Sequence, residues 1–380
     1  MKLIINNPVK FCTALSEMAV AISPKSVVPE LSCIRITVED DIRLFGTTGH
    51  ISLSKIIKPD SDVVVSEPGD VLVDYSLFNS AVSSIRSKLE VRTTKSSLIV
   101  QSIENKKIRR QIPQANVENH PREVKISADP VEVDSAMLRA SIQRVRFAMI
   151  QEGSRPELNG IYLGEYSMGG DGVRLASFKT GIGMDVTVPA EALDPLIAIL
   201  PTSGKVSVAA DSWISVTRDD GTVLRFSKST EFPAVVGKMR DQFLQKDFST
   251  RIVASTALIR SVLSPMLVYA DRATAYGINY AKMQYSGDCV DVSIDVPDMG
   301  TFEDILPVEE ISGEEFTILF HPRSLIDILN ICSGKSVTIR VFSNSDPLVI
   351  TDSDASEWVV LQSLINTRET VQEKEDGDDF

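Results

Sequence analysis

A threefold internal repeat is the feature that most constrains the fold of this 380-residue chain. An amphipathic stretch, with apolar residues at i, i+4 and i+7, opens each repeat at 8–22, 134–150 and 256–270. Two runs with nearly alternating apolar residues follow, then a second short helical stretch and further strand-like runs. These second helices are predicted at 74–86, 189–200 and 321–332. The first helices start at 8, 134 and 256, so the chain reads as three copies of one unit.

The repeat predicts an α+β fold in which each unit places two helices on one face of an antiparallel sheet. Polar, weakly periodic linkers are expected near 116–124 and 239–247. The predicted domains are therefore 1–120, 124–240 and 247–366, followed by an acidic disordered tail at 367–380. A unit repeated head to tail builds a ring when its rotation closes and a filament when it does not.

The charge balance excludes a protein that wraps nucleic acid with a broadly basic surface. The chain has 52 acidic and 39 basic residues, a net charge of −13. Six acids and one lysine in residues 369–380 account for −5 of that total. Any contact with nucleic acid must therefore depend on where the basic residues lie.

Cysteine usage and hydropathy indicate a cytoplasmic protein. Cys12, Cys33, Cys289 and Cys332 are far apart and form no Cys-x-x-Cys pair, as expected of reduced core residues. Polar residues and Pro8 interrupt the N-terminal stretch too soon for a signal peptide. No stretch approaches the ~20 apolar residues of a membrane span, so no membrane contact is expected.

Residues with catalytic chemistry do not converge in the sequence. His50, His120 and His321 are far apart and lack the spacing of zinc ligands. Gly181-x-Gly183 lacks the third glycine of a dinucleotide loop, and no Gly-x-Ser-x-Gly elbow occurs. The acidic run 288–304 lacks the spacing of an EF-hand. We expect no catalytic residues, cofactor or metal, and an enzyme built of repeated α+β domains is the remote alternative.

Four stretches, in order and at matching spacing, resemble the bacterial DNA polymerase III beta subunit (beta sliding clamp) family. They are ELSCIRITVEDDIRLFGTTGHISL at 30–53, RPELNGIYL at 155–163, FSKSTEFPAVV at 226–236 and ILFHPRSLIDILNICSGKSVTIRV at 318–341. The resemblance runs from residue 1 to about 365. Its sequence differences indicate a divergent member, as a phage- or plasmid-borne copy would be.

The resemblance implies a head-to-tail homodimer whose six domains form a ring around double-stranded DNA and tether a DNA polymerase. A clamp loader is the further partner, the role lies in DNA replication, and the protein catalyses nothing. The alternative is a clamp-like regulator or decoy that binds clamp partners without loading on DNA.

Flexible basic side chains on the pore-lining helices would touch phosphates without reading bases. On the helix at 134–150, one face carries Arg139, Gln143 and Arg146. The full set of expected DNA-binding residues is Lys25, Arg86, Arg139, Gln143, Arg146, Gln151, Arg155 and Arg260. Across the six helices, basic residues number seven against six acidic ones. A merely solvated helix face is the alternative.

Two oppositely charged runs are expected to meet at the dimer interface. Residues 105–112 carry four bases and no acid, whereas 288–304 carry six acids and no base. Opposite charges would favour head-to-tail pairing, with apolar contacts holding the joint. The expected residues are Lys106, Lys107, Arg109, Arg110, Val268, Tyr269, Asp295, Asp298, Glu303 and Asp304. The alternative is that both runs are only solvated.

The resemblance also places a cleft for a partner peptide between the second and third domains. The matching residues are Leu158, Ser177, Lys179, Thr180, Gly181, Ile182, Val360, Leu361, Gln362, Ser363 and Leu364. The family's Thr-Asp-Gly-His-Arg-Leu reads here SFKTGI at 177–182, and its Met-Pro-Met-Arg-Leu ending reads LQSLI at 361–365. These departures put the peptide preference in doubt, and an ordinary strand and turn are the alternative.

Overall fold

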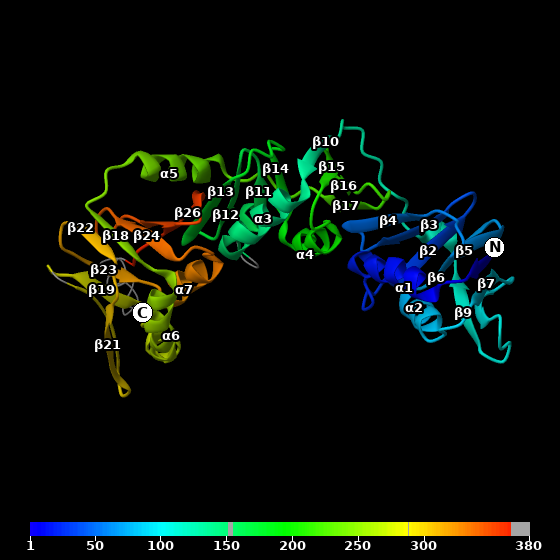
Figure 1. The fold of residues 1–380 in the computed structure, drawn as a ribbon, viewed down its shortest axis with the longest axis horizontal. Helices are drawn as coiled ribbons and strands as arrows, with labels where there is room; N and C mark the ends of the chain where they lie inside the picture. Colours follow the sequence, from blue (N-terminus) through cyan, green and yellow to red (C-terminus); the bar gives the residue numbers. More distant parts are fainter. Residues whose placement is uncertain (151–154, 288, 366–380) are drawn as a thin grey trace, which may run out of the picture. The chain divides into compact units, whose positions relative to one another are not determined.

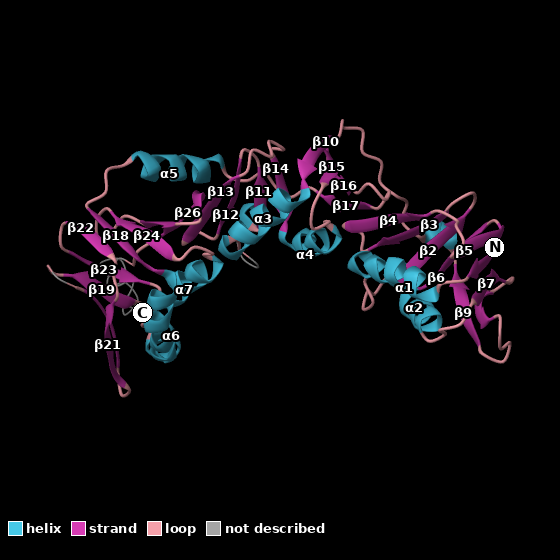
Figure 2. Ribbon diagram, viewed as in Figure 1, coloured by secondary structure: helices cyan, strands magenta, loops and turns pink. Residues whose placement is uncertain are grey.

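The computed structural model describes residues 1–150, 155–287 and 289–365. Six helices follow the sequence prediction to within three residues at most ends, and several close with 3-10 turns (Figure 2). They are α1 (Pro8–Glu17), α2 (Tyr75–Ser83), α3 (Ser135–Val145), α4 (Ala190–Ile199), α6 (Thr256–Ala273) and α7 (Pro322–Ile331).

Local caps explain where these helices begin. The Asn7 side chain accepts a hydrogen bond from the Lys10 amide at the start of α1, where Pro8 occupies the first turn. Asp74 caps α2 and Ser255 caps α6 in the same way. Each cap satisfies an amide that has no partner within its helix.

The chain divides into two compact units. The first comprises Met1–Arg139 and Glu191–Ser229, and the second comprises Ala140–Ala190 and the residues from Thr230 onward. The first unit holds one antiparallel sheet with thirteen strands among its described residues, shown with its helices in Figure 1. In spatial order these are β10 (Val131–Asp134), β15 (Lys205–Ala210), β16 (Trp213–Thr217), β17 (Val223–Ser227), β4 (Ile51–Ile57), β3 (Ile42–Thr47), β2 (Cys33–Val38), β6 (Gly69–Asp74), β9 (Arg109–Ala115), β8 (Ser97–Ser102), β7 (Leu89–Thr93), β1 (Lys2–Ile5) and β5 (Val63–Glu67).

The second unit holds two antiparallel sheets among its described residues. The larger runs β14 (Val186–Pro189), β11 (Gly160–Leu163), β12 (Tyr166–Gly170), β13 (Arg174–Lys179), β26 (Ala355–Gln362), β25 (Leu348–Asp352), β24 (Ser336–Val341), β18 (Thr250–Ser255) and β22 (Glu310–Gly313). The smaller runs β21 (Gly300–Leu306), β20 (Val290–Val296), β19 (Ala281–Tyr285) and β23 (Phe316–Phe320).

The element order repeats three times along the chain. Each repeat opens with a strand and a helix, continues through four or five strands to a second helix, and ends with three strands. The repeats thus run from β1 to β9, from β10 to β17 and from β18 to β26. The α+β class and its triplication are confirmed, whereas the predicted domain boundaries stay predictions.

One helix lies between two of the repeats, in the segment where a polar, weakly periodic linker was predicted near 239–247. Helix α5 (Ala234–Gln245) lies between the second and third repeats. Its buried residues are Arg240 and Phe243, with Val236 partly buried one turn earlier. The 236, 240, 243 spacing is helical, but an arginine in the middle position hid the pattern.

None of the helices in the described ranges has the length and apolar character needed to cross a lipid bilayer.

Candidate functional site

The predicted DNA-facing residues differ in their exposure to solvent. Lys25, Arg86, Gln143 and Arg155 are exposed, whereas Arg139, Arg146 and Arg260 are half-buried. Arg86 follows α2, which ends at Ser83, so it lies on a loop rather than on the predicted helix. Gln151 lies outside the described residues.

Two of the half-buried arginines hold the backbone of the protein itself. The Arg139 Nη2 donates to the carbonyl of Leu200, just beyond α4, at 2.5 Å. The Arg260 Nε donates to the Thr256 carbonyl one turn earlier in α6, at 3.4 Å. Each guanidinium keeps further N–H donors, but these bonds tie its side chain to the protein's own backbone.

Three further helix cations are neutralised by carboxylates. Lys10 of α1 lies 2.9 Å from both Asp60 and Asp62. Arg144 of α3 pairs with Asp352, and Arg323 of α7 pairs with Asp271. The helices therefore offer less free positive charge than the residue count suggests.

Arg144 belongs to a buried network rather than to a solvated helix face. Its guanidinium lies 3.0 Å from Asp352, whose side chain is 0% exposed, and donates to the Ser333 hydroxyl at 2.7 Å. The Trp358 indole donates to the Arg144 carbonyl at 2.8 Å, and its ring lies 5.5 Å from the guanidinium. Burial acts to raise the pKa of Asp352, but the Ser333 amide and Arg144 lower it by more, so the carboxylate stays ionised.

The predicted peptide-pocket strands lie side by side. Strand β13 pairs antiparallel with β26, placing Ser177 opposite Val359 and Leu175 opposite Leu361. Because side chains alternate along a strand, Ser177, Lys179 and Leu361 share one face. Val360 and Gln362 point to the opposite face, where the neighbouring Trp358 meets Arg144. The predicted pocket residues of these strands therefore lie on both faces of the sheet, so a single surface cleft cannot be lined by all of them.

The other predicted pocket residues lie around these strands. Leu158 is buried and approaches Gly170 of β12, while Ser363 and Leu364 are half-buried beyond β26. Thr180, Gly181 and Ile182 form the turn after β13, where the Thr180 hydroxyl donates to the Gly164 carbonyl at 3.1 Å. Gly181 has a φ of +64°, a left-handed conformation that glycine adopts readily.

Helix α5 covers the face that carries Leu361. Phe243 packs into an apolar cluster with Leu175, Val359 and Leu361, extended by Phe342 and Val349. Val236 of α5 and Met168 of β12 pack against the same cluster. Figure 1 shows α5 lying along this face of the sheet. Sequence reasoning missed this arrangement, although the spacing of Val236, Arg240 and Phe243 held the signal.

The predicted basic interface run forms a hairpin with an open edge. Lys106 and Lys107 lie in the turn between β8 and β9, and Arg109 and Arg110 begin β9; all four are exposed. Strand β8 pairs with β9 along Arg109–Pro113, whereas the described pairing of β6 with β9 covers only Gln114 and Ala115. One edge of β9 is thus unpaired at its basic end within the described residues.

The predicted acidic run forms the edge of the smaller sheet in the second unit. Asp295 lies on β20, Asp298 in the turn, and Glu303 and Asp304 on β21; all are exposed, while Asp288 lies outside the described residues. Strand β21 is the terminal strand of its sheet. Val268 is 58% exposed, and the adjacent Tyr269 packs against Phe302 of β21, with ring centroids 5.7 Å apart.

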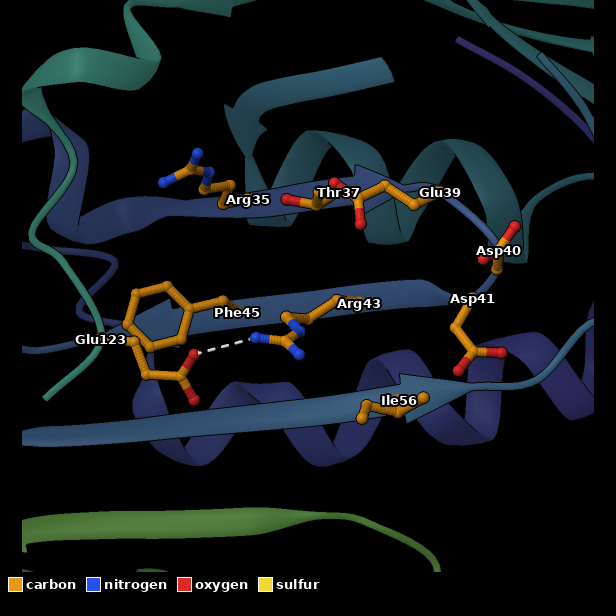
Figure 3. Close-up of a pocket in the computed structure, with 9 residues that line it drawn as sticks. All are labelled: Arg35, Thr37, Glu39, Asp40, Asp41, Arg43, Phe45, Ile56 and Glu123. Atoms are coloured by element: carbon orange, nitrogen blue, oxygen red, sulfur yellow. Dashed lines mark hydrogen bonds and ion pairs between the residues drawn. The ribbon is translucent and has the colours of Figure 1, made fainter. Parts of the chain in front are cut away.

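A polar hollow of about 510 Å³ in the first unit marks where the segment after β9 is anchored. Figure 3 shows Arg43 and Phe45 of β3 beside Glu123, which lies 3.3 Å from Arg43. The same carboxylate lies 2.7 Å from Arg225. The buried His120 packs edge-on against Phe45, with ring centroids 5.4 Å apart. These interactions fasten the segment to the sheet.

Within the described part of the chain, no three His, Cys, Asp or Glu side chains gather as metal ligands would. The carboxylates of the acidic run are instead spread along β20, the turn and β21.

Comparison with known proteins identifies the fold. Residues 1–123 match the family model of the DNA polymerase III beta subunit, N-terminal domain. The chain is 24% identical over 368 residues to the beta sliding clamp of Streptococcus pneumoniae, covering 91% of this chain and 94% of that protein. The Bacillus subtilis beta sliding clamp is 21% identical over 358 residues, covering 89% and 92%.

Solved structures match over nearly the whole chain. The DNA polymerase III beta chain of Streptococcus pneumoniae superposes with a TM-score of 0.86 at 23% identity, covering 96% of this chain and 99% of that one. The Pseudomonas aeruginosa DNA polymerase III subunit beta gives 0.84 at 19% identity, covering 96% and 100%. Residues 1–123 thus match the DNA polymerase III beta subunit, N-terminal domain, and the triplicated α+β fold of the whole chain is that of the solved DNA polymerase III beta chains.

Proposed function

We propose that this chain is a DNA sliding clamp. Two copies join head to tail into a ring that encircles duplex DNA and holds a DNA polymerase on its template, after a clamp loader has opened the ring. The observation that carries the proposal is the triplicated fold, matched over 96% of the chain by a DNA polymerase III beta chain. The role is mechanical, and no catalytic residue is assigned.

The two open sheet edges support head-to-tail pairing. An unpaired strand edge readily takes up a strand from another chain. The exposed end of β9 is basic, with Arg109 and Arg110, whereas β21 is acidic, with Glu303 and Asp304. Opposite charge favours β9 of one copy beside β21 of the other and disfavours pairing of like edges.

Apolar side chains near both edges supply the binding energy in this proposal. Leu77 and Ile108 are 53% and 38% exposed in the first unit, and Val268 and Ile305 are 58% and 55% exposed in the second. Burying a fully exposed side chain of this kind contributes ~1.5–3 kcal/mol, and these side chains, about half exposed, have roughly half of that to gain on pairing. An exposed ion pair contributes only ~0–1 kcal/mol, so the charges set the orientation and the apolar contacts set the affinity.

Neutralised helix cations support retention by topology rather than by affinity. Lys10, Arg144 and Arg323 are already paired with carboxylates, and Arg139 and Arg260 hold backbone carbonyls. Few phosphate contacts then remain, which gives weak binding with a shallow salt dependence. A closed ring nonetheless stays on DNA that has no free end, and weak contacts let it slide.

A DNA-loading experiment tests the proposal. The protein is loaded on a nicked circular plasmid with a bacterial clamp loader and ATP, and the DNA-bound fraction is isolated by gel filtration before and after cutting the plasmid once. We expect retention on the circle and loss after linearisation. Light scattering should give a mass near twice 41.6 kDa. Equal retention on both DNA forms would contradict sliding, and a monomeric mass would contradict the ring.

The clamp-like regulator or decoy is the second candidate. The neutralised helix cations are equally compatible with it, because a decoy needs no DNA-facing charge. Such a protein would bind a polymerase or clamp loader yet show no retention on circular DNA. The same loading experiment therefore separates the two functions.

A further inference from the structure

We propose that helix α5 is a removable strap, which occupies the apolar face of β13 and β26 and must leave before a partner peptide can bind there. This inference rests on the proposed function, because it concerns access to the partner site of a clamp. It goes beyond that function by assigning a regulatory role to a helix that lies outside the threefold repeat.

The inner side of α5 occupies the face as a bound amphipathic helix would. Phe243 is 7% exposed and lies among Leu175, Val359 and Leu361, which come from the two strands carrying the predicted pocket residues. Two turns earlier, Val236 packs on the same cluster beside Met168 of β12. A peptide that used this face would have to take the positions of these two side chains.

Polar contacts fasten α5 at the two edges of the covered face. The Arg240 guanidinium stacks on Tyr166 of β12, with its carbon 3.4 Å from the ring centroid. The predicted pocket residue Lys179 lies 6.0 Å from the same ring. Beyond the last turn, Lys246 lies 2.8 Å from Asp346. These contacts are few, and the ion pair is exposed, so they restrain α5 without locking it.

The sequence of α5 makes it a weak helix away from the sheet. Pro233 at its N-cap provides no side-chain hydrogen bond, the first turn has no acid and the last turn has no base. Val235, Val236 and Gly237 in the first turn disfavour the helical state. A 12-residue helix of this kind is not stable alone in water, so its order depends on the packing of Val236, Arg240 and Phe243.

The outer side of α5 offers a matched control position. Leu244 is 37% exposed and directly follows the buried Phe243. Phe243→Ser removes the anchor from the cluster, whereas Leu244→Ser makes a comparable apolar-to-polar change on the exposed side. Both variants keep the chain length, the net charge and the sheet.

The first measurement uses the unmodified protein. Hydrogen exchange followed by mass spectrometry compares peptides from α5 with peptides from β24, β25 and β26. Local opening predicts that α5 amides exchange at least about 100-fold faster than the central strands. If α5 exchanges at the rate of those strands, it opens only with the whole unit, and the proposal is overturned.

The second measurement asks whether the uncovered face binds a peptide. The probe is a fluorescent synthetic copy of residues 232–246, followed by fluorescence anisotropy with full-length protein. The tethered α5 competes at a high effective concentration, so Phe243→Ser should bind the probe about tenfold more tightly than the unmodified protein or Leu244→Ser. A probe carrying the same Phe243→Ser change should bind none of them. Equal binding by all three proteins overturns the proposal.

Failure of the proposed function would look different. A chain that never stays on circular DNA but shows fast exchange of α5 and binds the probe is a partner-binding protein with this strap and not a clamp. A chain that loads on DNA but keeps α5 closed is a clamp without the strap.

Discussion

Replacing Arg144 with methionine tests the buried network that joins α3 to the sheet of the second unit. The substitution keeps an unbranched stem of similar bulk but removes the charge that faces Asp352 at 3.0 Å. Asp352 is fully buried, so the change leaves a carboxylate without its ionic partner. Removing one partner of a buried ion pair costs ~3–5 kcal/mol.

The structure places the expected loss at the lower end of that range. Asp352 still accepts hydrogen bonds from the amides of Ser333 and Gly334, both at 2.9 Å, and from the Asp354 amide at 3.2 Å. These donors continue to stabilise the carboxylate, so we expect Arg144→Met to lower the free energy of unfolding by ~3 kcal/mol. The indole of Trp358 should also lose the cation at its face.

Urea unfolding followed by tryptophan fluorescence measures the loss. The chain has two tryptophans, so a Trp213→Phe background leaves Trp358 as the reporter of the second unit. With an m-value of ~3 kcal/mol/M, the expected loss moves the midpoint by ~1 M. The Trp358 fluorescence change reports the unfolding of the second unit only, because a multidomain chain need not unfold in one step.

A matched control and a pH series complete the test. Lys246 is 41% exposed and pairs with Asp346 at the surface, so Lys246→Met should cost only ~0–1 kcal/mol. The pKa of Asp352 is lowered in the folded state, so its contribution is present above the unfolded pKa and is lost as pH falls through the folded pKa. The difference between Arg144→Met and the parent should therefore shrink in acid. A midpoint shift no larger than that of Lys246→Met would refute the reasoning.

Three other predictions concern the first unit, a tight strand crossing and the dimer. Burial, aided by the charge of Arg35, lowers the pKa of His120 to about 4 in the folded protein. The pKa of an unfolded histidine is ~6.5. The free energy of unfolding should therefore fall by up to ~3 kcal/mol as the pH drops from ~6.5 to about 4. His120→Phe should abolish this pH dependence of the free energy of unfolding, measured by Trp213 fluorescence. An unchanged pH dependence in His120→Phe would contradict the assignment to His120. Gly160 has a φ of +155°, and a Cβ added there would lie 2.4 Å from the Val188 carbonyl oxygen. Gly160→Ala should therefore destabilise the second unit by more than ~2 kcal/mol, measured in a thermal melt. A loss under ~0.5 kcal/mol would show that the two strands move apart to accommodate the methyl group. The double variant Arg109→Glu with Arg110→Glu should weaken dimerisation at low salt, and less so at high salt, as measured by analytical ultracentrifugation. An unchanged dissociation constant would show that these residues do not contribute to the interface.

The secondary structure of the repeats was predictable because it is encoded locally. Apolar residues at helical spacing, with caps such as Asp74 and Ser255, defined the helices to within a few residues. The oppositely charged runs were equally visible, since charge patterning is a property of the sequence alone. The structure places the basic run at β9, which lies between β8 and β6 in its sheet, and the acidic run at β20 and the terminal strand β21.

The role of individual charges was not predictable, because it depends on residues far away in the chain. Arg144 lies within the helix predicted at 134–150, yet its partner Asp352 is more than two hundred residues away. Arg240 reads as part of a polar linker, yet it is buried by stacking on Tyr166. In both cases the pairing partner decides whether an arginine meets solvent or completes a core.

By itself, the sequence determined the triplicated α+β architecture, its helices and the opposite charges of its two edges, because periodicity and charge are carried by neighbouring residues. Only the tertiary structure decided which cations are free to meet a phosphate and which strand face lies beneath α5. Those outcomes depend on long-range packing, where alternation along β26 sends Leu361 towards Phe243 and the adjacent Val360 to the other side.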